Sequence, residues 1–184
     1  MKKHIVTACL YTAITAVVLG LVYPLLITGF AKLLFHDKAD GQLIVQNGEV
    51  IGSRLIGQAF TGPGYFHSRP SAAGAGYDAA SSSGSNLGPT SKALADRVTT
   101  SVTAETTGAP VPIDLVTTSA SGLDPDITPA AALYQVPRVA HERRLADAQV
   151  RDLVLAHIDA RQFGLLGEPR VNVLALNLAL NSLR

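Results

Sequence analysis

IVTACLYTAITAVVLGLVYPLLITGFA, residues 5–31, decides the architecture of this chain, because its 27 consecutive residues carry no charge. About 20 apolar residues in an α-helix cross the hydrocarbon core of a bilayer, so the stretch predicts one transmembrane helix. At about 1.5 Å per residue it would reach about 40 Å across a core of about 30 Å, which favours a tilt or a kink. We expect the kink at Pro24, because proline removes a helical hydrogen bond.

The residues around this stretch set the expected topology. A cleavable signal peptide is the competing interpretation, since Gly29, Phe30 and Ala31 have a small-x-small form, but signal cores usually span about 7 to 15 residues. Lys2 and Lys3 lie closest to the membrane edge, which favours a cytoplasmic amino terminus. We expect residues 1–35 to form a helix with a short cytoplasmic start. Residues 36–184 then form an outer domain, periplasmic or extracellular, of a bacterial inner-membrane protein.

A row of small or special residues recurs every four positions along the apolar stretch. Its members are Ala8, Thr12, Ala16, Gly20, Pro24 and Thr28. Small side chains let a second helix approach closely, and such packing drives helix association in lipid. The row predicts a packing surface for a partner helix; the alternative is a plain anchor in which the spacing arose by chance.

Composition narrows the function of the rest of the chain. After residue 32 there are 12 basic and 14 acidic residues, so the domain has no basic footprint for nucleic acid. The single cysteine, Cys9, lies inside the apolar stretch. The domain therefore has no disulfide and no cysteine-ligated metal.

Local patterns predict an α+β domain with a small sheet and several short helices. Asn47-Gly48 lies between two β-type runs in residues 42–52 and predicts a hairpin. Residues 60–89 are rich in Gly, Ser, Ala and Pro, which indicates long irregular structure. Thr128 and Pro129 resemble an N-cap and first helical residue of a helix that Pro137 interrupts near residue 135. The remaining expected elements are helices over 91–107, 147–159 and 176–183, strands over 113–117 and 170–174, and a turn over 119–126.

Motifs for catalysis are missing from the sequence. No Gly-Lys pair exists for a phosphate-binding loop, and no Ser-x-x-Lys motif exists for a penicillin-recognising enzyme. Asp78, Asp124 and Asp126 fit no metal-binding loop, and Asp beside Pro commonly forms turns. His67 and His141 stand in no triad order. Arg138, Arg143 and Arg144 are interpreted as a solvated helix face, and Asn172, Asn177 and Asn181 as side chains that tie down the closing helix.

Four strings in order give the chain a family resemblance: FHSRPS (66–71), YDAASSSGSNLGPT (77–90), DLVTTSASGLDP (114–125) and GEPRVNVL (167–174). Together they resemble KdpC, the C subunit of the Kdp potassium-transporting ATPase, over nearly the whole chain. Two positions depart from the family pattern: Asp126 stands where His is common, and Ser91 where Asn is common. Any ligand role of that His is therefore in doubt here.

The resemblance implies a non-catalytic subunit without a cofactor of its own. Its partners would be a potassium-channel-like A subunit, a P-type ATPase B subunit, a small F subunit and the lipid bilayer. It also implies a catalytic chaperone that raises the ATP affinity of the B subunit. An outer domain cannot touch cytoplasmic ATP, so such an effect would have to travel through helix packing.

Two other functions stay open, and one loop is singled out. The chain could be a membrane-anchored ligand-binding module or a serine-dependent hydrolase that uses Ser81, Ser82, Ser83 or Ser85. The candidate contact loop for another subunit comprises Tyr65, Phe66, Arg69, Tyr77 and Asn86, and the first four are also the expected contacts of a ligand-binding module.

Overall fold

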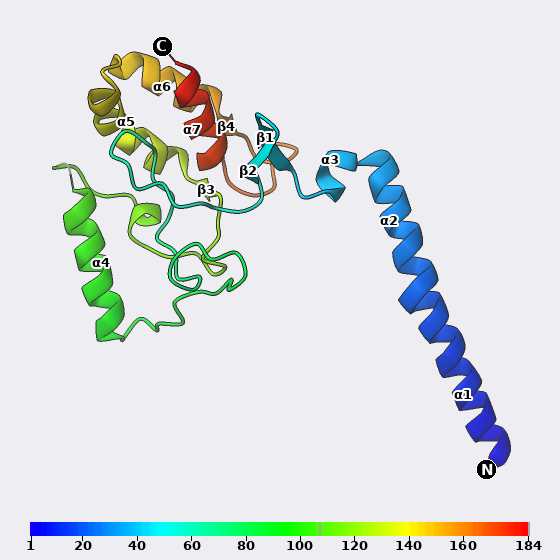
Figure 1. Cartoon of the computed structure of the whole chain (residues 1–184). Coiled ribbons are helices and arrows are strands. Elements are labelled where there is room, and N and C mark those ends of the chain that lie inside the picture. Colours follow the sequence, from blue (N-terminus) through cyan, green and yellow to red (C-terminus); the bar gives the residue numbers. More distant parts are fainter. Residues whose placement is uncertain (107, 184) are drawn as a thin grey trace. The chain divides into compact units, whose positions relative to one another are not determined.

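The computed structural model describes residues 1–106 and 108–183, and Figure 1 shows its elements. The chain forms two compact units, residues 1–50 and the part from Ile51 onward. The sequence predicts that the membrane segment ends at residue 35. The division after Val50 separates compact units and does not show where a bilayer ends. The boundary at residue 35 therefore stays a prediction.

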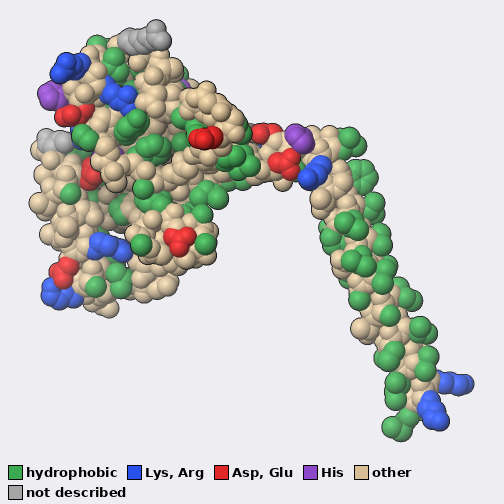
Figure 2. Space-filling view, viewed as in Figure 1, with side chains coloured by type: hydrophobic (Ala, Val, Ile, Leu, Met, Phe, Trp, Pro, Cys, Tyr) green, Lys and Arg blue, Asp and Glu red, His purple; other side chains and the backbone are tan. Residues whose placement is uncertain are grey.

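The first unit begins with a long apolar helix. It comprises α1 (Lys2–Val17), a π-helical turn η1 (Val18–Val22) and α2 (Tyr23–Leu34). Among the described residues, it is the one helix that is both long enough and apolar enough to cross a membrane. Hydrophobic side chains cover it along its length in Figure 2, and none of them is buried within the chain. A helix that is apolar all round needs an apolar solvent, which agrees with the predicted transmembrane span.

The helix leaves α geometry in the turn just before Pro24. Pro24 has no N–H, so the carbonyl of Gly20, four residues earlier, loses its α-helical partner. A π-turn pairs residues five apart and accommodates such a gap. The irregularity therefore lies where the sequence predicts a kink, in the form of a π-helical turn.

A short helix and a hairpin follow. Helix α3 (His36–Ala39) leads to β1 (Leu43–Gln46) and β2 (Glu49–Ser53), which form a two-stranded sheet. Asn47 and Gly48, between the strands, have φ of 55° and 84°. Both values are those of a type I′ turn, so the hairpin prediction is confirmed.

The second unit is built around a three-stranded antiparallel sheet in the order β3-β5-β4. Its strands are β3 (Asp126–Ile127), β4 (Ile158–Asp159) and β5 (Arg170–Asn172). Val171, in the central strand, pairs with Ile127 on one side and with Ile158 on the other. Val171 has no exposed surface, so this short strand joins the sheet to the hydrophobic core.

Three helices supply most of the core around the sheet (Figure 1). They are α5 (Pro129–Arg143), α6 (Asp147–Ala156) and α7 (Val173–Ser182). Helix α5 packs small residues such as Ala131 and Ala140 against Val150 and Val154 of α6, and α7 adds Leu176 and Leu180. Each large buried side chain stabilises the fold by about 1.5 to 3 kcal/mol. The α+β domain predicted from the sequence is confirmed.

Side chains begin two of these helices, and the sequence predicts the first of the two caps, Thr128. The Thr128 hydroxyl accepts a hydrogen bond from the Ala131 amide at 3.2 Å and caps α5. The Asn172 carboxamide accepts one from Ala175 at 3.0 Å and caps α7. Such caps satisfy backbone donors that the first helical turn leaves without partners.

Two predicted elements are wrong. Residues 113–117 are not a strand: Ile113–Leu115 form the 3-10 helix η2, because the Asp114 carboxylate turns inward and accepts from the Thr128 amide at 2.8 Å. Pro137 does not interrupt α5, which continues to Arg143. Pro137 is exposed while Val136 and Val139 beside it are buried, so core packing holds the helix across the missing hydrogen bond.

Irregular backbone connects the hairpin to α4 (Lys92–Glu105), as predicted. Residues 54–91, all of which the structure describes, form neither helix nor strand. Leu94 and Val98 of α4 are half-buried and Val102 is exposed, so the expected apolar face is only partly covered. The end predicted for this helix, Thr107, lies outside the described residues.

The irregular segment is packed at defined points. Ser71 donates to the carbonyl of Gly122 at 2.6 Å and accepts from the Tyr77 amide at 2.8 Å. Gly122 has φ of 66°, and a Cβ there would come within 2.6 Å of the Ser83 carbonyl oxygen. Only glycine lets these two loops approach so closely.

Candidate functional site

Phe66, the centre of the candidate contact loop, lies in the core with no exposed surface. Its backbone amide donates to the side-chain oxygen Oδ1 of Asn177 at 2.9 Å, and its backbone carbonyl accepts from the side-chain nitrogen Nδ2 of Asn177 at 2.9 Å. A single asparagine of α7 therefore binds both polar groups of a buried residue 111 positions earlier. Phe66 therefore has no surface for contact with another molecule, and its role is to hold the loop in place.

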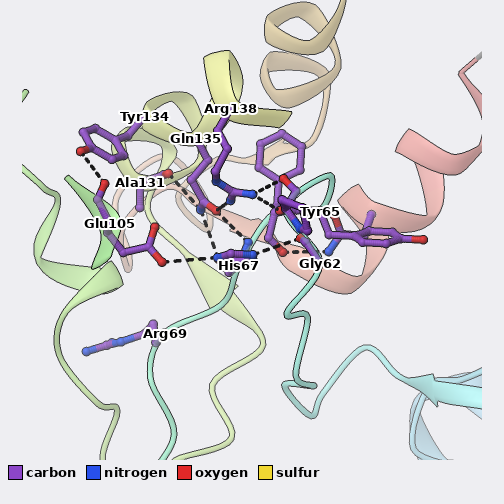
Figure 3. Close-up of polar contacts among 12 residues, drawn as sticks. Gly62, Tyr65, His67, Arg69, Glu105, Ala131, Tyr134, Gln135 and Arg138 are labelled. Carbon is purple, nitrogen blue, oxygen red and sulfur yellow. Dashed lines mark hydrogen bonds and ion pairs between the residues drawn. The ribbon is translucent and has the colours of Figure 1, made fainter. Parts of the chain in front are cut away.

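The next residue, His67, is held by α5 in a similar way. The Gln135 side chain accepts from the His67 amide at 2.7 Å and donates to the His67 carbonyl at 3.1 Å. Arg138 donates to Gln135 at 2.7 Å and to the Tyr65 carbonyl at 3.0 Å (Figure 3). Burial lowers the pKa of the Arg138 guanidinium below its ordinary value, against the opposing effect of Glu105 and Glu142.

The Tyr65 ring has two neighbours, Arg143 and Phe60. The Arg143 guanidinium lies 4.4 Å from the centre of the Tyr65 ring, and the Phe60 ring centre lies 5.7 Å from it. Arg143 also donates to the Gly64 carbonyl at 2.7 Å and to Asn181 at 2.9 Å. The interpretation of Arg138 and Arg143 as a solvated helix face is therefore wrong, because their side chains bind the loop.

The imidazole of His67 links the loop to α4. Its Nδ1 lies 3.4 Å from a carboxylate oxygen of Glu105, and its Nε2 lies 3.2 Å from the Gly62 carbonyl oxygen (Figure 3). The hydrogen bond to His67 is the main cause that lowers the pKa of Glu105, and Arg138 lowers it further. The Tyr134 hydroxyl donates to the Glu105 carbonyl at 2.9 Å, so the end of α4 is held from two sides.

Arg69 and Tyr77 complete the loop. The Arg69 guanidinium pairs with Asp124 at 3.2 Å and lies within 3.4 Å of the Thr117 carbonyl oxygen. The Tyr77 hydroxyl donates to the Arg69 carbonyl, and burial raises the pKa of the Tyr77 phenol. Tyr77 adopts φ of 57°, an uncommon value for a bulky residue, and this hydrogen bond helps to hold it there.

Asn86, the last predicted member of the loop, is exposed and also has positive φ, of 52°. The structure thus brings Tyr65, Phe66, Arg69 and Tyr77 into one bonded segment with α5 and α7. Asn86 takes no part in the hydrogen bonds described above for this segment. Whether the loop contacts another molecule stays a prediction.

A cleft of about 360 Å³ lies beside the loop. Its lining includes Phe60, His67, Arg69, Tyr77 and Glu105. Among the described residues no group of three His, Cys, Asp or Glu side chains could hold a metal ion. Two hydroxyls of the serine-rich stretch donate to backbone carbonyls, Ser82 to Ser121 and Ser83 to Ala72.

The three aspartates weighed as metal ligands have other partners. Asp124 pairs with Arg69, and Asp78 accepts from the Ala80 amide at 2.9 Å. Asp126 pairs with Arg170 at 3.0 Å and accepts from Asn172 at 3.1 Å. Burial raises the pKa of Asp126 above its ordinary value, although Asn172 and Arg170 oppose this.

The row of small residues in the apolar helix is exposed along its whole length. In a regular α-helix a four-residue spacing drifts by about 40° per step around the axis. The π-turn at Val18–Val22 is wound more loosely, which counteracts this drift in the middle of the row. A Cβ at Gly20 would meet no atom of the chain within 4 Å, so the surface is open to a partner.

Sequence reasoning missed Gln135, and it named Asn177 without its partner Phe66. Gln135 and Asn177 are almost fully buried, and both sit on otherwise apolar helix faces. A buried amide must find hydrogen-bond partners, so a polar residue within an apolar face was the available signal. The predicted role of Asn172, Asn177 and Asn181 in tying down α7 is confirmed by their bonds.

Known proteins resemble this chain over its full length. The family model described as KdpC, K+-transporting ATPase, c chain, matches residues 5–182. A potassium-transporting ATPase KdpC subunit of Acidobacterium capsulatum is 64% identical, over 98% of this chain and 99% of that protein. One of Koribacter versatilis is 61% identical, over 98% and 95%. One of Methylobacterium nodulans is 54% identical, over 100% and 98%. The chain belongs to the KdpC family, the c chain of the K+-transporting ATPase.

Proposed function

We propose that the chain is a non-catalytic subunit of an ATP-driven potassium uptake complex, needed for its assembly and stability. One observation carries the proposal: the ionisable side chains at the cleft, His67, Arg69, Tyr77 and Glu105, are bound to partners within the chain. His67 joins Glu105, Arg69 joins Asp124, and Arg138 joins Gln135 and the loop backbone. Such bonds hold the surface beside the cleft in a defined shape, as a subunit contact requires.

We place the domain on the outer side of the membrane and the amino terminus in the cytoplasm. Lys2 and Lys3 precede the apolar helix, which supports this orientation. After the helix, Lys32 and His36 both pair with Asp40, at 3.5 Å each. A carboxyl-terminal alkaline phosphatase fusion should be active, and a carboxyl-terminal fluorescent protein that matures only in the cytoplasm should be dark. The reverse pattern would refute this topology.

The proposed partners are a potassium-channel-like A subunit, a P-type ATPase B subunit and a small F subunit. We propose that the exposed row from Ala8 to Thr28 packs against a helix of one of them. Gly20→Leu tests this, because a Cβ at Gly20 would meet no atom of the chain within 4 Å. We expect Gly20→Leu to reduce copurification of the other subunits and growth at low potassium, while Leu19→Val, a control outside the row, leaves both unchanged.

Deletion of the gene should abolish growth at low potassium in a strain that depends on this pump, with recovery from a plasmid copy. Normal growth of the deletion strain would contradict the proposed function.

We also propose that the chain raises the ATP affinity of the B subunit by coupling through the helices. The KM for ATP of the purified B subunit should fall when the chain is added, and ATP should not bind to the isolated chain.

A ligand-binding module is the second candidate, because the cleft of about 360 Å³ has the size of small-molecule sites. Calorimetry on the purified full chain with potassium salts and ATP would test this reading. The serine hydrolase is disfavoured by the bonds of Ser82 and Ser83 to backbone carbonyls. Labelling of the chain by a serine-reactive fluorophosphonate would support the serine hydrolase.

A further inference from the structure

The loop between β4 and β5 ends in a tight turn with an apolar tip. Gln162 and Leu166 exchange two backbone hydrogen bonds, each of 2.9 Å, and enclose Phe163, Gly164 and Leu165. Both strands beside the loop belong to the three-stranded sheet, where Asp159 pairs with Arg170 in register. The base of the loop is therefore fixed to the core sheet.

The tip exposes three large hydrophobic side chains together. Phe163 is 91% exposed, Leu165 79% and Leu166 61%. Among the described residues after residue 50, no large hydrophobic side chain is more exposed than Phe163 or Leu165. Single exposed hydrophobic residues are common, but a contiguous group at a protruding tip marks a contact site.

The backbone at the tip adds an independent observation. Phe163 has φ of 54°, in the left-handed region that is unfavourable for a bulky residue, and Gly164 follows with φ of 74°. Strained conformations of this kind cost about 1 to 3 kcal/mol and cluster at ligand clamps and other functional sites. With 91% of its surface exposed, Phe163 gains almost no packing within the chain that would offset this strain. The backbone hydrogen bonds of the turn hold Phe163 in this conformation, and its side chain is left available for a contact outside the chain.

Charge at the base of the loop favours a protein pocket over an anionic lipid surface. Arg161 pairs with Glu168 at 2.5 Å, and Arg170 pairs with Asp126 at 3.0 Å and Asp159 at 3.7 Å. The four charged residues of 159–170 therefore cancel, and Asp126 adds a further negative charge. Loops that bind anionic membranes carry an excess of Lys and Arg. An apolar tip with a neutral, ion-paired rim is instead typical of an anchor residue in a protein interface.

We propose that residues 161–168 form an anchor that inserts Phe163 and Leu165 into an apolar pocket of another subunit of the K+-transporting ATPase. The inference rests on the proposed function, since it needs a complex of subunits. The tip is presented by a closed turn on the core sheet, so little conformational freedom is lost when it binds. Phe163 is the central contact, and Leu165 and Leu166 exclude water around it.

The test uses the full chain, tagged and coexpressed with the other subunits, in detergent. Phe163→Asn removes the ring but keeps a residue that tolerates positive φ, so the domain should unfold at the same temperature or higher. We expect the complex to dissociate at a protein concentration at least about tenfold higher than the wild type, the loss typical of an anchor residue. Leu155→Asn, at a 49% exposed position of α6, is the matched control and should leave assembly unchanged.

The outcomes separate this inference from the proposed function. If the wild-type chain retains no other subunit, the proposed function fails. If the wild type assembles and Phe163→Asn assembles equally well, the anchor is refuted. A bimane probe on Phe163→Cys, in a Cys9→Ser background, identifies the environment in vesicles. A blue shift only with the other subunits present supports the protein pocket, and the same shift with the chain alone overturns it in favour of lipid.

Discussion

Replacement of Asn177 by alanine is the sharpest test of how the loop is held. Asn177 is 1% exposed, and its carboxamide bonds to both the amide and the carbonyl of Phe66, each at 2.9 Å. Phe66 has no exposed surface, so water cannot replace the lost partner. The substitution leaves one buried donor and one buried acceptor without a hydrogen bond.

The expected magnitude follows from these two groups. An unsatisfied buried polar group costs about 1 to 3 kcal/mol, so the free energy of unfolding should fall by about 2 to 6 kcal/mol. This is a large part of the total stability of about 5 to 15 kcal/mol that is usual for a domain. With a urea m-value of about 2 kcal/mol/M, the unfolding midpoint should fall by about 1 to 3 M.

The assay is urea unfolding of the full chain in detergent, followed by near-ultraviolet circular dichroism of the tyrosines. Asn181→Ala is the control, because Asn181 is exposed and accepts from Arg143 at the surface, so its loss should cost about 0.5 kcal/mol. Asn177→Asp keeps the acceptor for the Phe66 amide but, once ionised, loses the donor, so it should be less stable at neutral than at acidic pH. If Asn177→Ala unfolds at the same urea concentration as Asn181→Ala, the clamp does not contribute as argued.

Three further predictions concern pH and helix geometry. The pKa of Glu105 is lowered in the fold, mainly by His67, so its contribution to stability should be present above its ordinary pKa of 4.5 and lost as pH falls through the lower folded value. Stability of wild type and Glu105→Gln should therefore converge in acid, and a constant difference would contradict this. The pKa of Asp126 is raised by burial, so its contribution should be present below its ordinary value of 3.8 and lost as pH rises through the folded value. Asp126→Asn, which cannot ionise, should gain stability relative to wild type as pH rises from about 3 to 7, and a loss of stability of the variant relative to wild type over this range would refute it. Pro137→Ala should raise the unfolding free energy by about 1 to 3 kcal/mol, since an exposed interior proline costs α5 a hydrogen bond to Leu133; a lower melting temperature would argue against this.

Local patterns in the sequence predicted the elements whose cause is local. The hairpin at Asn47-Gly48 and the cap at Thr128 depend on residues within a few positions of each other, and both were found. The strand over 113–117 was wrong because apolar alternation does not reveal that Asp114 binds the Thr128 amide, 14 residues later. The break at Pro137 was wrong because propensity alone does not include the packing of Val136 and Val139.

In the candidate contact loop, too, sequence patterns predicted the local features but not the contacts with distant residues. The composition of residues 60–89 predicted irregular structure, and the structure brings four of the five candidate contact residues there into one bonded segment. The residues that hold them, Gln135 and Asn177, lie 68 and 111 positions away from their partners. No local pattern links such positions.

By itself the sequence determined the apolar helix, the small-residue row and the α+β class, because hydrophobicity and spacing act along the chain. The tertiary structure decided how the loop is used. It placed Phe66 in the core, drew Arg138 and Arg143 onto the loop backbone, and left Phe163 outside. Whether a side chain is buried, bound or exposed depends on segments that meet only after folding, and the hydrogen bonds of buried groups are set by that meeting.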